Sequence, residues 1–410
     1  MMKQDSTQNP IIVVGGGVAG IVAALDLAAA GRSVELVENA ERLGGQVANL
    51  DKVYPGDHCA FCPLWTDIKR VQDNGNIRVR LSSKISDITN GDDGKKVTIS
   101  TDPRCINDEL CVFCGRCKDL CGPKAIRPAW EHASPPSYYI DKSKCTNCGD
   151  CVSVCPTGAI GIDRPSVKVA LVADDIIWAT GFREADLTPL AELGYGTHRD
   201  IMTSLEFEEW TAEAGPNQGR ILRRSSGRAP RNIAFIQCAG ARDQRLLSYC
   251  SGVCCMHALK QAQWVKRRSP EIDCTIFYTD LRTVGRDYFD YGLRSLGMTT
   301  GVTLVRGRPG FIRPMPGGDA VALKYENTET QAAELARFDM VVLNGNLASS
   351  LTEDRDCSSP VTLDHNGFFS ADEESQGIAC GFSREPADIA EAVIQASSAA
   401  INAMPRTGGS

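Results

Sequence analysis

Cysteines are the residues of this 410-residue chain best suited to chemistry, and most of its 18 cysteines are clustered. Two runs share the spacing C-x2-C-x2-C-x3-C. The first run is Cys111, Cys114, Cys117 and Cys121, and the second is Cys145, Cys148, Cys151 and Cys155. Soft thiolates stabilise iron–sulfur cores, so two such runs indicate one-electron chemistry at two [4Fe–4S] clusters.

This spacing is that of bacterial two-cluster ferredoxins, in which the fourth cysteine of each run ligates the other cluster. We therefore expect Cys155 to join the first three cysteines of run one, and Cys121 to join the first three of run two. Two zinc ribbons are the alternative, but structural zinc sites use four ligands in paired knuckles, which fits twin runs of this kind poorly. Cys105, just before the first run, is interpreted as a spare thiol.

A third set has the spacing C-x11-C-x3-C-C and matches no general cluster motif. Its members are Cys238, Cys250, Cys254 and Cys255. By spacing alone it is equally compatible with a metal site and with buried thiols at a strand end and a helix start. A C-x-x-C pair, Cys59 and Cys62, leaves three interpretations open, namely a redox dithiol, an extra cluster contact or packed thiols.

A glycine-rich turn follows the β-branched run at 11–14. It reads Gly15-x-Gly17-x-x-Gly20 and opens a helix of small residues, and a second strand then ends at Glu38. Glycines allow the backbone to approach a pyrophosphate, the helix N-terminus favours its charge, and the acid binds ribose hydroxyls. Together these features predict a dinucleotide site, and Glu38 disfavours a 2′-phosphate. An unrelated Gly-rich turn is the alternative.

Two further segments favour FAD over NAD at this site. Residues 38–46 look like the loop after the second strand of flavoproteins with two dinucleotide-binding domains, and the Ala-Thr-Gly turn at 179–181 is similar to their re-entry segment. The expected cofactor-binding residues are Gly15, Gly17, Val18, Ala19, Gly20, Glu38, Asn39, Arg42, Gly45, Gln46, Thr180 and Gly181. Near the C-terminus the matching segment 377–382 lacks the aspartate that usually meets the ribityl chain.

A second α/β region has predicted strands at 232–237 and 274–278 and a helix at about 250–268. The turn after the first of these strands, residues 238–243, is not GxGxxG. We therefore expect no glycine cradle for a nicotinamide nucleotide and no direct reduction by NAD(P)H.

The positions of these motifs predict an α/β fold in which a cysteine-rich module interrupts a dinucleotide-binding domain. The expected parts are an FAD-binding domain over 1–100, 166–183 and 336–410, a two-cluster ferredoxin module over 101–165, and a second α/β domain over 184–335. A net charge of −7 argues against nucleic-acid binding. The longest apolar stretch contains glycines and Asp26, so we expect no membrane span.

Several segments resemble the A subunit of heterodisulfide reductase. They are YPGDHCAFCP at 54–63, QCAGARD at 237–243, YCSGVCCMHALKQA at 249–262, DLRTVGRDY at 280–288 and GIACGFSREPADIAEAV at 377–393. The resemblance covers nearly the whole chain. It implies a Rossmann-like, thioredoxin-reductase-like FAD core with an inserted two-cluster ferredoxin module.

The resemblance also implies residue roles that spacing leaves open. It implies a third [4Fe–4S] cluster on the third cysteine set. It further implies that Lys260 lies beside the flavin ring, where an ammonium would stabilise anionic reduced flavin. The alternative for Lys260 is a solvated helix lysine.

The compact length looks like the A subunit of the quinone-interacting membrane-bound oxidoreductase complex, which implies electron transfer between menaquinone and adenylylsulfate reductase in dissimilatory sulfur metabolism. The implied partners are a second flavin and iron–sulfur subunit of the same family and a membrane haem b, quinone-reactive subunit. They would hold the chain at the inner face of the cytoplasmic membrane. The alternative is the A subunit of a soluble heterodisulfide-reductase-like complex, including a flavin-bifurcating one. An assembly scaffold with degenerate sites is the rival from a different class.

Overall fold

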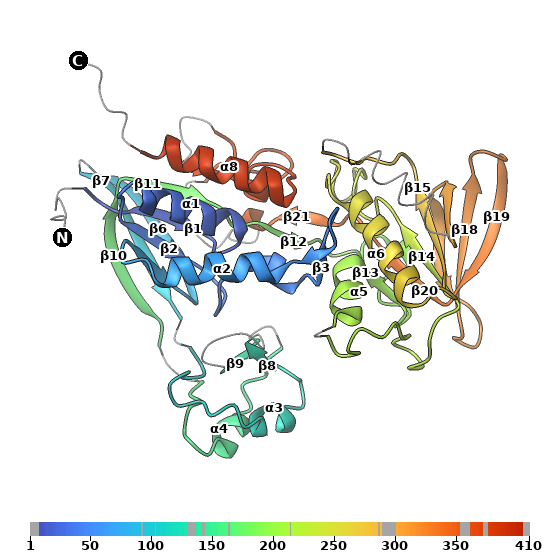
Figure 1. Cartoon of the computed structure of the whole chain (residues 1–410), viewed down its shortest axis with the longest axis horizontal. Helices are drawn as coiled ribbons and strands as arrows, with labels where there is room; N and C mark the ends of the chain where they lie inside the picture. The colour runs from blue at the N-terminus through green and yellow to red at the C-terminus, as the bar shows by residue number, and fades with distance from the viewer. Residues whose placement is uncertain are drawn as a thin grey trace.

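A computed structural model gives the fold as two α/β domains side by side, with a small module hanging from the first (Figure 1). The structure describes residues 8–91, 93–102, 104–129, 137–141, 144–162, 165–213, 215–285, 288, 301–352, 361–371 and 376–404. Among these residues no helix is long and apolar enough to cross a membrane.

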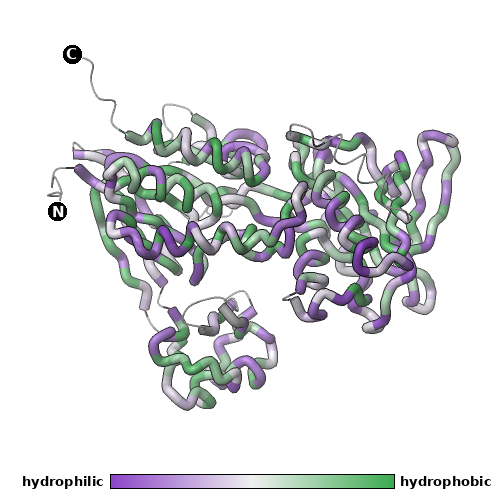
Figure 2. Tube along the Cα trace, viewed as in Figure 1, coloured by the Kyte–Doolittle hydropathy of each residue, from purple (hydrophilic) through white to green (hydrophobic). Residues whose placement is uncertain are grey.

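The first domain is built on a five-stranded parallel sheet of order β22-β11-β1-β2-β5. Its strands are β1 (Ile11–Val14), β2 (Val34–Val37), β5 (Ile77–Arg80), β11 (Asp175–Trp178) and β22 (Ile378–Ala379). The helices α1 (Val18–Ala29), α2 (Phe61–Gln72) and α8 (Ile389–Asn402) share one hydrophobic core with this sheet. α1 consists mostly of alanine, valine and leucine and is hydrophobic along most of its length (Figure 2). It is therefore buried between the strands and α8.

An antiparallel sheet of order β10-β7-β6 shares a second core with the opposite-facing residues of the same parallel sheet. Its strands are β6 (Ser83–Gly91), β7 (Gly94–Thr101) and β10 (Val167–Ala173). β7 pairs with β10 from Lys95 opposite Ala173 to Thr101 opposite Val167. The cysteine-rich module is therefore inserted into the loop of a β-hairpin, and the paired ends of β7 and β10 are its point of attachment to the first domain.

The inserted module contains two short helices, α3 (Arg116–Leu120) and α4 (Asp150–Val154), and one hairpin of β8 (Ile126–Ala129) with β9 (Ser137–Ile140). A bridge between Ile106 and Ile160 closes its base. Its small core consists of isoleucines, alanines, Tyr138 and several cysteines. The module lies below the parallel sheet in the view of Figure 1.

The second domain has a parallel sheet of order β13-β20-β14-β15-β16. These strands are β13 (Ile201–Thr203), β14 (Asn232–Ile236), β15 (Asp273–Tyr278), β16 (Val302–Arg306) and β20 (Met340–Leu343). The helices α5 (Ser204–Thr211) and α6 (Cys254–Arg268) flank it, and α6 ends in a hydrophilic basic turn (Figure 2). An antiparallel meander of β17 (Pro309–Pro314), β18 (Val321–Asn327) and β19 (Ala332–Phe338) completes the domain.

One expected boundary is wrong. The sequence pattern places the segment beginning at residue 336 in the FAD-binding domain, but β20 pairs with both β13 and β14 at the centre of the second sheet. The chain returns to the first domain only afterwards, through β21 (Leu347–Ser349), which pairs with β12 (Phe182–Glu184). A buried apolar strand pairs equally well in either sheet, so the sequence pattern does not show which sheet receives it.

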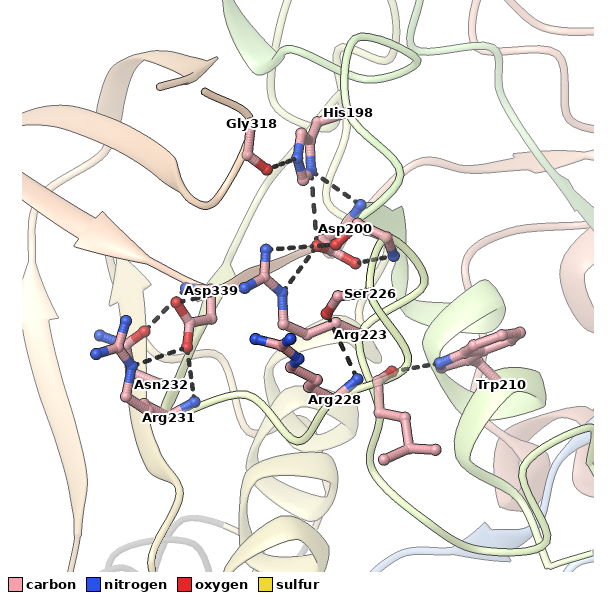
Figure 3. Close-up of polar contacts among 12 residues, drawn as sticks. His198, Asp200, Trp210, Arg223, Ser226, Arg228, Arg231, Asn232, Gly318 and Asp339 are labelled. Carbon is pink, nitrogen blue, oxygen red and sulfur yellow. Dashed lines mark hydrogen bonds and ion pairs between the residues drawn. The ribbon is translucent and has the colours of Figure 1, made fainter. Parts of the chain in front are cut away.

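The basic loop at 216–231 is fixed to the second sheet by two buried carboxylates (Figure 3). Asp200, fully buried before β13, accepts hydrogen bonds from Arg223 Nε at 3.0 Å and from Ser225 N at 2.9 Å. Asp339, buried before β20, accepts from Arg231 N at 2.8 Å. Both carboxylates precede parallel strands, so this network lies at the amino edge of the sheet and supports the fold.

We predict that Asp200→Ala lowers the free energy of unfolding by about 3–5 kcal/mol, because the half-buried Arg223 guanidinium loses its main partner. Asp319→Asn, a change at an exposed aspartate of the same domain, is the control and should stay within about 0.5 kcal/mol. Urea unfolding followed by circular dichroism measures both. Equal stability of the two variants would contradict the structural role of Asp200.

Candidate functional site

A cavity of about 730 Å³ lies at the carboxyl ends of β1, β2 and β11. It is lined by all the predicted cofactor-binding residues except Gly20. The loop around η1 (Gly45–Asn49), the turn after β11 and the N-terminal end of α8 form its walls. Open α/β sheets bind nucleotides in this place, because loops diverge there and helix N-termini point inward.

The glycines of the turn serve two different purposes. Gly15 has φ +106°, and a Cβ on it would lie 2.2 Å from the carbonyl oxygen of Ala179, while a Cβ on Gly20 would lie 1.8 Å from the carbonyl oxygen of Gly15. These two glycines allow strand and helix to pack. A Cβ on Gly17 would meet only Gly45 Cα, at 3.8 Å, so the protein alone does not require glycine there. Gly17 is the position whose missing side chain leaves room for a ligand, and this supports a phosphate-bearing cofactor.

Glu38 closes the second strand and is bound to the glycine turn. Its Oε2 accepts from Gly16 N at 2.5 Å and its Oε1 accepts from Ala40 N at 2.7 Å. Burial raises the pKa of Glu38, while the hydrogen bonds from Ala40 and Gly16 act in the opposite direction. The carboxylate therefore lies at the edge of the cavity in the place where a ribose would meet it.

The C-terminal segment also contributes to the cavity wall, through Cys380, Gly381 and Phe382. No aspartate is present in that stretch, as the sequence indicated. Asp388, the N-cap of α8, lines the cavity as well and accepts from Glu391 N at 2.8 Å. The sequence pattern places Asp388 at the start of this helix, where Asp-x-x-Glu forms a capping box, but it gave no sign that Asp388 lines the cavity.

The cysteines of the inserted module surround two small cavities. Cys111, Cys114, Cys117 and Cys155 line one of them, and Cys121, Cys145, Cys148 and Cys151 line the other. These are the crossed sets that the ferredoxin spacing predicts. No group of three or more His, Cys, Asp or Glu side chains in the described part of the chain is placed to hold a single metal ion. A [4Fe–4S] cluster does not need such a group, because each of its four cysteines binds a different iron atom of the cluster.

The two halves of the module repeat one another in their sulfur contacts. Ala125 N donates to Cys121 Sγ and Ala159 N donates to Cys155 Sγ, both at 3.3 Å. Hydrogen bonds to cluster sulfurs help to set reduction potentials. The fourth cysteine of each run, Cys121 or Cys155, thus accepts a hydrogen bond from the backbone N–H four residues later in the chain.

The third cysteine set lies at the carboxyl edge of the second sheet. Cys238 lies in the turn two residues after the end of β14, and the adjacent Ala239 N donates to Asn344 O at 2.8 Å. Cys254 and Cys255 open α6, where their side chains hydrogen-bond to each other. Burial raises the pKa of Cys238, with Cys255 and Cys250 adding to the effect as like charges. The four thiols of this set thus lie near enough to affect one another's pKa.

This location is the one that a nicotinamide nucleotide occupies in comparable sheets. The turn after β14 has no glycine cradle, and Cys238 itself adopts φ +57°. A Cβ on Gly345, in the turn after β20, would lie 3.2 Å from Cys238 Cα. The cysteine-bearing turn and its neighbour thus approach closely where a nucleotide would need an open crevice.

The structure does not place Lys260 at the dinucleotide cavity. Its Nζ donates to Glu208 Oε1 at 2.6 Å and to Lys52 O at 2.9 Å, and the side chain is buried. That Lys260 lies beside the flavin ring stays a prediction. Its partner Glu208 is a buried acid 52 residues earlier in the chain that sequence reasoning did not single out.

Glu208 is the centre of a contact between the two domains. It accepts from the backbone N–H of Asp51 at 3.2 Å, in the first domain, and its other oxygen contacts His257 Nε2 at 3.2 Å and Gln261 Nε2 at 3.0 Å. Burial opposes its ionisation, but Lys260 and His257 hold its pKa well below the ordinary range. Burial and the nearby Lys260 lower the pKa of His257.

Models of protein families match the N-terminal part of the first domain and the region of the inserted module. An NAD(P)-binding Rossmann-like domain matches residues 13–67. Two models of a 4Fe-4S dicluster domain match residues 75–159 and 137–188.

Similar proteins of known identity cover nearly the whole chain. The iron-sulfur A subunit of the CoB–CoM heterodisulfide reductase of Methanocaldococcus jannaschii is 33% identical over 95% of this chain and 63% of its own length. The A subunit of the H2:CoB–CoM heterodisulfide,ferredoxin reductase of Methanothermobacter marburgensis is 32% identical, over 97% and 64%. A protein of Archaeoglobus profundus that is like the heterodisulfide reductase A subunits is 31% identical, over 98% and 66%. The chain spans just under two thirds of the length of these relatives.

Among solved structures, thioredoxin reductases share the fold. The Lactococcus lactis enzyme superposes with a TM-score of 0.55 at 14% identity, covering 97% of this chain and 98% of that one. The T. acidophilum enzyme gives 0.53 at 14% identity with the same coverage. The fold is thus a thioredoxin-reductase-like pair of Rossmann domains with an inserted dicluster ferredoxin module. The chain is a homologue of the heterodisulfide reductase A subunits.

We predict that Gly17→Ala weakens FAD binding at least about tenfold, or about 1.4 kcal/mol, because a methyl group enters the space reserved for phosphate. The fold tolerates the methyl group, so iron content and melting temperature should not change. The measurement is FAD released per chain on denaturation. Gly75→Ala, an exposed glycine with open space around it, is the control. Full FAD occupancy in the Gly17 variant would contradict the assignment of the cavity.

We predict that Glu208→Gln lowers the free energy of unfolding at neutral pH by about 3–5 kcal/mol, because Lys260 becomes a buried, unpaired cation. The folded-state pKa of Glu208 is depressed, so its stabilising effect is full above the ordinary carboxyl range and is lost as pH falls through the folded-state value. The difference from the wild type should therefore shrink in acid, as measured by urea unfolding across pH.

Two variants control for this prediction. Glu209→Gln changes an exposed acid on the same helix, whose partner Arg127 lies at 3.2 Å on the surface, and should cost less than about 1 kcal/mol. The double variant Glu208→Gln, Lys260→Met removes both charges and should recover part of the loss. A double variant less stable than Glu208→Gln alone would contradict the pairing.

Proposed function

We propose that this chain is an electron-transfer subunit of an oxidoreductase complex, with one FAD and three [4Fe–4S] clusters. The observation that carries the proposal is the grouping of twelve cysteines into three sets of four in a chain that also has a dinucleotide cavity. A flavin exchanges electrons in pairs or singly and clusters exchange them singly, so such a protein connects two-electron and one-electron chemistry.

The residues of the chain divide this work among them. The glycine turn and Glu38 would hold the nucleotide end of FAD, and Thr180 and Gly181 would lie along its path through the cavity. The two crossed sets in the module would each hold one cluster. The third set, on Cys238, Cys250, Cys254 and Cys255, would hold a cluster at the edge where a nicotinamide nucleotide is otherwise bound.

The position of the third set supports a specific choice of electron source. Because cysteines and a close backbone contact occupy the nucleotide crevice, electrons would enter the second domain through a cluster rather than as hydride from NAD(P)H. Lys260 would act as a positioning residue: through Glu208 it connects the helix that bears Cys254 to the first domain.

Partners and substrates follow from the relatives only as proposals. Two of the relatives named above, those of Methanocaldococcus jannaschii and Methanothermobacter marburgensis, are subunits of CoB–CoM heterodisulfide reductases. A soluble complex of the heterodisulfide-reductase kind, including one with a bifurcating flavin, accounts for this chain directly. A complex that passes electrons between menaquinone and adenylylsulfate reductase, held at the membrane by a haem b subunit, is the second candidate. A flavin cavity and several one-electron sites in the same chain suit this candidate as well, because a quinol delivers electrons in pairs.

One anaerobic experiment separates these candidates. The native protein is isolated with its partners in detergent, and spectra are recorded after a menaquinol analogue and then NADH are added. Co-purification of haem b with a response to menaquinol supports the quinone complex. Soluble partners without a quinone response support the heterodisulfide-reductase-like complex. Rapid, stoichiometric reduction by NADH of the isolated chain would contradict the assignment of the second domain.

We predict that Cys148→Ser removes about four irons per chain, one cluster's worth, because a cluster ligand is lost. Cys105→Ser, in the same module but outside both cysteine-lined cavities, is the matched control and should retain the full iron content. Iron is measured by colorimetric assay after anaerobic isolation, together with the electron paramagnetic resonance spectrum of the reduced protein. Identical iron contents would contradict the crossed ligand sets.

A further inference from the structure

Two of the cysteines that lie outside the sites above form a pair. Cys59 ends the strand β4 (His58–Cys59), and Cys62 lies in the first turn of α2. Their side chains hydrogen-bond to each other, so the two sulfurs are adjacent. Neither residue lines the dinucleotide cavity or the two cavities of the module. The pair therefore needs its own explanation.

The pair is accessible from outside, unlike the other described thiols outside the three sets. Cys62 is exposed and Cys59 is half-buried. By contrast, Cys105, Cys274 and Cys380 are buried. A dissolved disulfide or a protein disulfide can therefore reach Cys59 and Cys62 without any rearrangement of the fold.

The surroundings of the pair distinguish its two sulfurs. Burial alone would raise the pKa of Cys59, but hydrogen bonds from the Cys62 side chain and from the backbone N–H groups of Cys62 and Phe61 lower it. The hydrogen bond to Cys59 raises the pKa of Cys62. The start of α2 thus favours a thiolate on Cys59 and keeps a proton on Cys62. This division suits an attacking thiolate and a resolving thiol.

The pair also lies at the junction of the two domains. Cys59 pairs with Lys52 across the hairpin of β3 (Lys52–Val53) and β4, and the carbonyl of Lys52 accepts from Lys260 of the second domain. Figure 1 shows β3 projecting toward α5 and α6. Lys52 is therefore the one residue that separates Cys59 from the Glu208–Lys260 contact, so oxidation of Cys59 would take place next to this contact.

We propose that Cys59 and Cys62 form a redox-active dithiol–disulfide couple that exchanges an electron pair with an external disulfide or dithiol. In the oxidising direction, the Cys59 thiolate attacks an external disulfide, forms a mixed disulfide and releases one thiolate. Cys62, on losing its proton, attacks Cys59 Sγ and releases the second thiolate. The protein disulfide forms, the external disulfide is cleaved, and two thiols result, so the pair loses two electrons and two protons. This activity goes beyond the proposed cluster and flavin chemistry.

The test uses the native, cofactor-loaded protein under anaerobic conditions. It is equilibrated in buffers of reduced and oxidised dithiothreitol at graded ratios, quenched with acid and alkylated, and each cysteine is quantified by peptide mass spectrometry. Cys59 and Cys62 should lose and regain alkylation together, along one two-electron transition. Continued alkylation of both cysteines at every ratio would overturn the proposal, and this arm needs no variant.

Serine variants separate the couple from a cluster contact. In Cys62→Ser, Cys59 should be either a free thiol or part of a mixed disulfide with the reagent, and the two-electron transition should disappear. Iron and FAD per chain should stay at the wild-type level. Cys274→Ser, at a buried thiol outside all the sets, should leave the transition unchanged. Loss of iron in Cys62→Ser would show that the pair ligates a cluster and would overturn the proposal. That outcome is independent of the Cys148 result, which tests the module alone.

Discussion

The buried carboxylate of Glu208 is the interaction that connects the halves of this molecule. One oxygen accepts from Lys260 and from backbone N–H groups of the first domain, and the other meets His257 and Gln261 of α6. A buried charge with this many partners fixes geometry because leaving any partner unpaired is costly. It sets α6, and with it the third cysteine set, against the hairpin that carries Cys59.

The positions of the redox residues follow from that arrangement and from parallel-sheet geometry. In both domains the chemically capable residues lie at the carboxyl ends of strands, where loops leave the sheet. The first sheet keeps a glycine-lined cavity there, and the second has cysteines in its place. The ferredoxin module is attached through the β7–β10 hairpin, so its two cysteine sets extend from the antiparallel sheet, whose strand β6 also lines the cavity.

Local patterns in the sequence predicted much of this correctly, because the ligands of each feature are close together in the chain. The strand–turn–helix around Gly15, the inserted module and the two-domain core need only short-range spacing. Features made by distant residues were missed. Glu208 pairs with Lys260 across 52 residues, and β20 pairs in a sheet that its apolar run did not specify. The meander of β17 to β19 was also missed, although β18 alternates buried residues with more exposed ones.

The most direct test of the account is the ratio of iron to FAD in the anaerobically isolated native chain. Iron, acid-labile sulfide and released FAD are measured on one sample against protein determined by amino-acid analysis. Three clusters and one flavin predict about twelve irons and twelve sulfides per FAD. About eight irons per FAD would contradict the account, because the third cysteine set would then hold no cluster and the second domain would need another way to receive electrons.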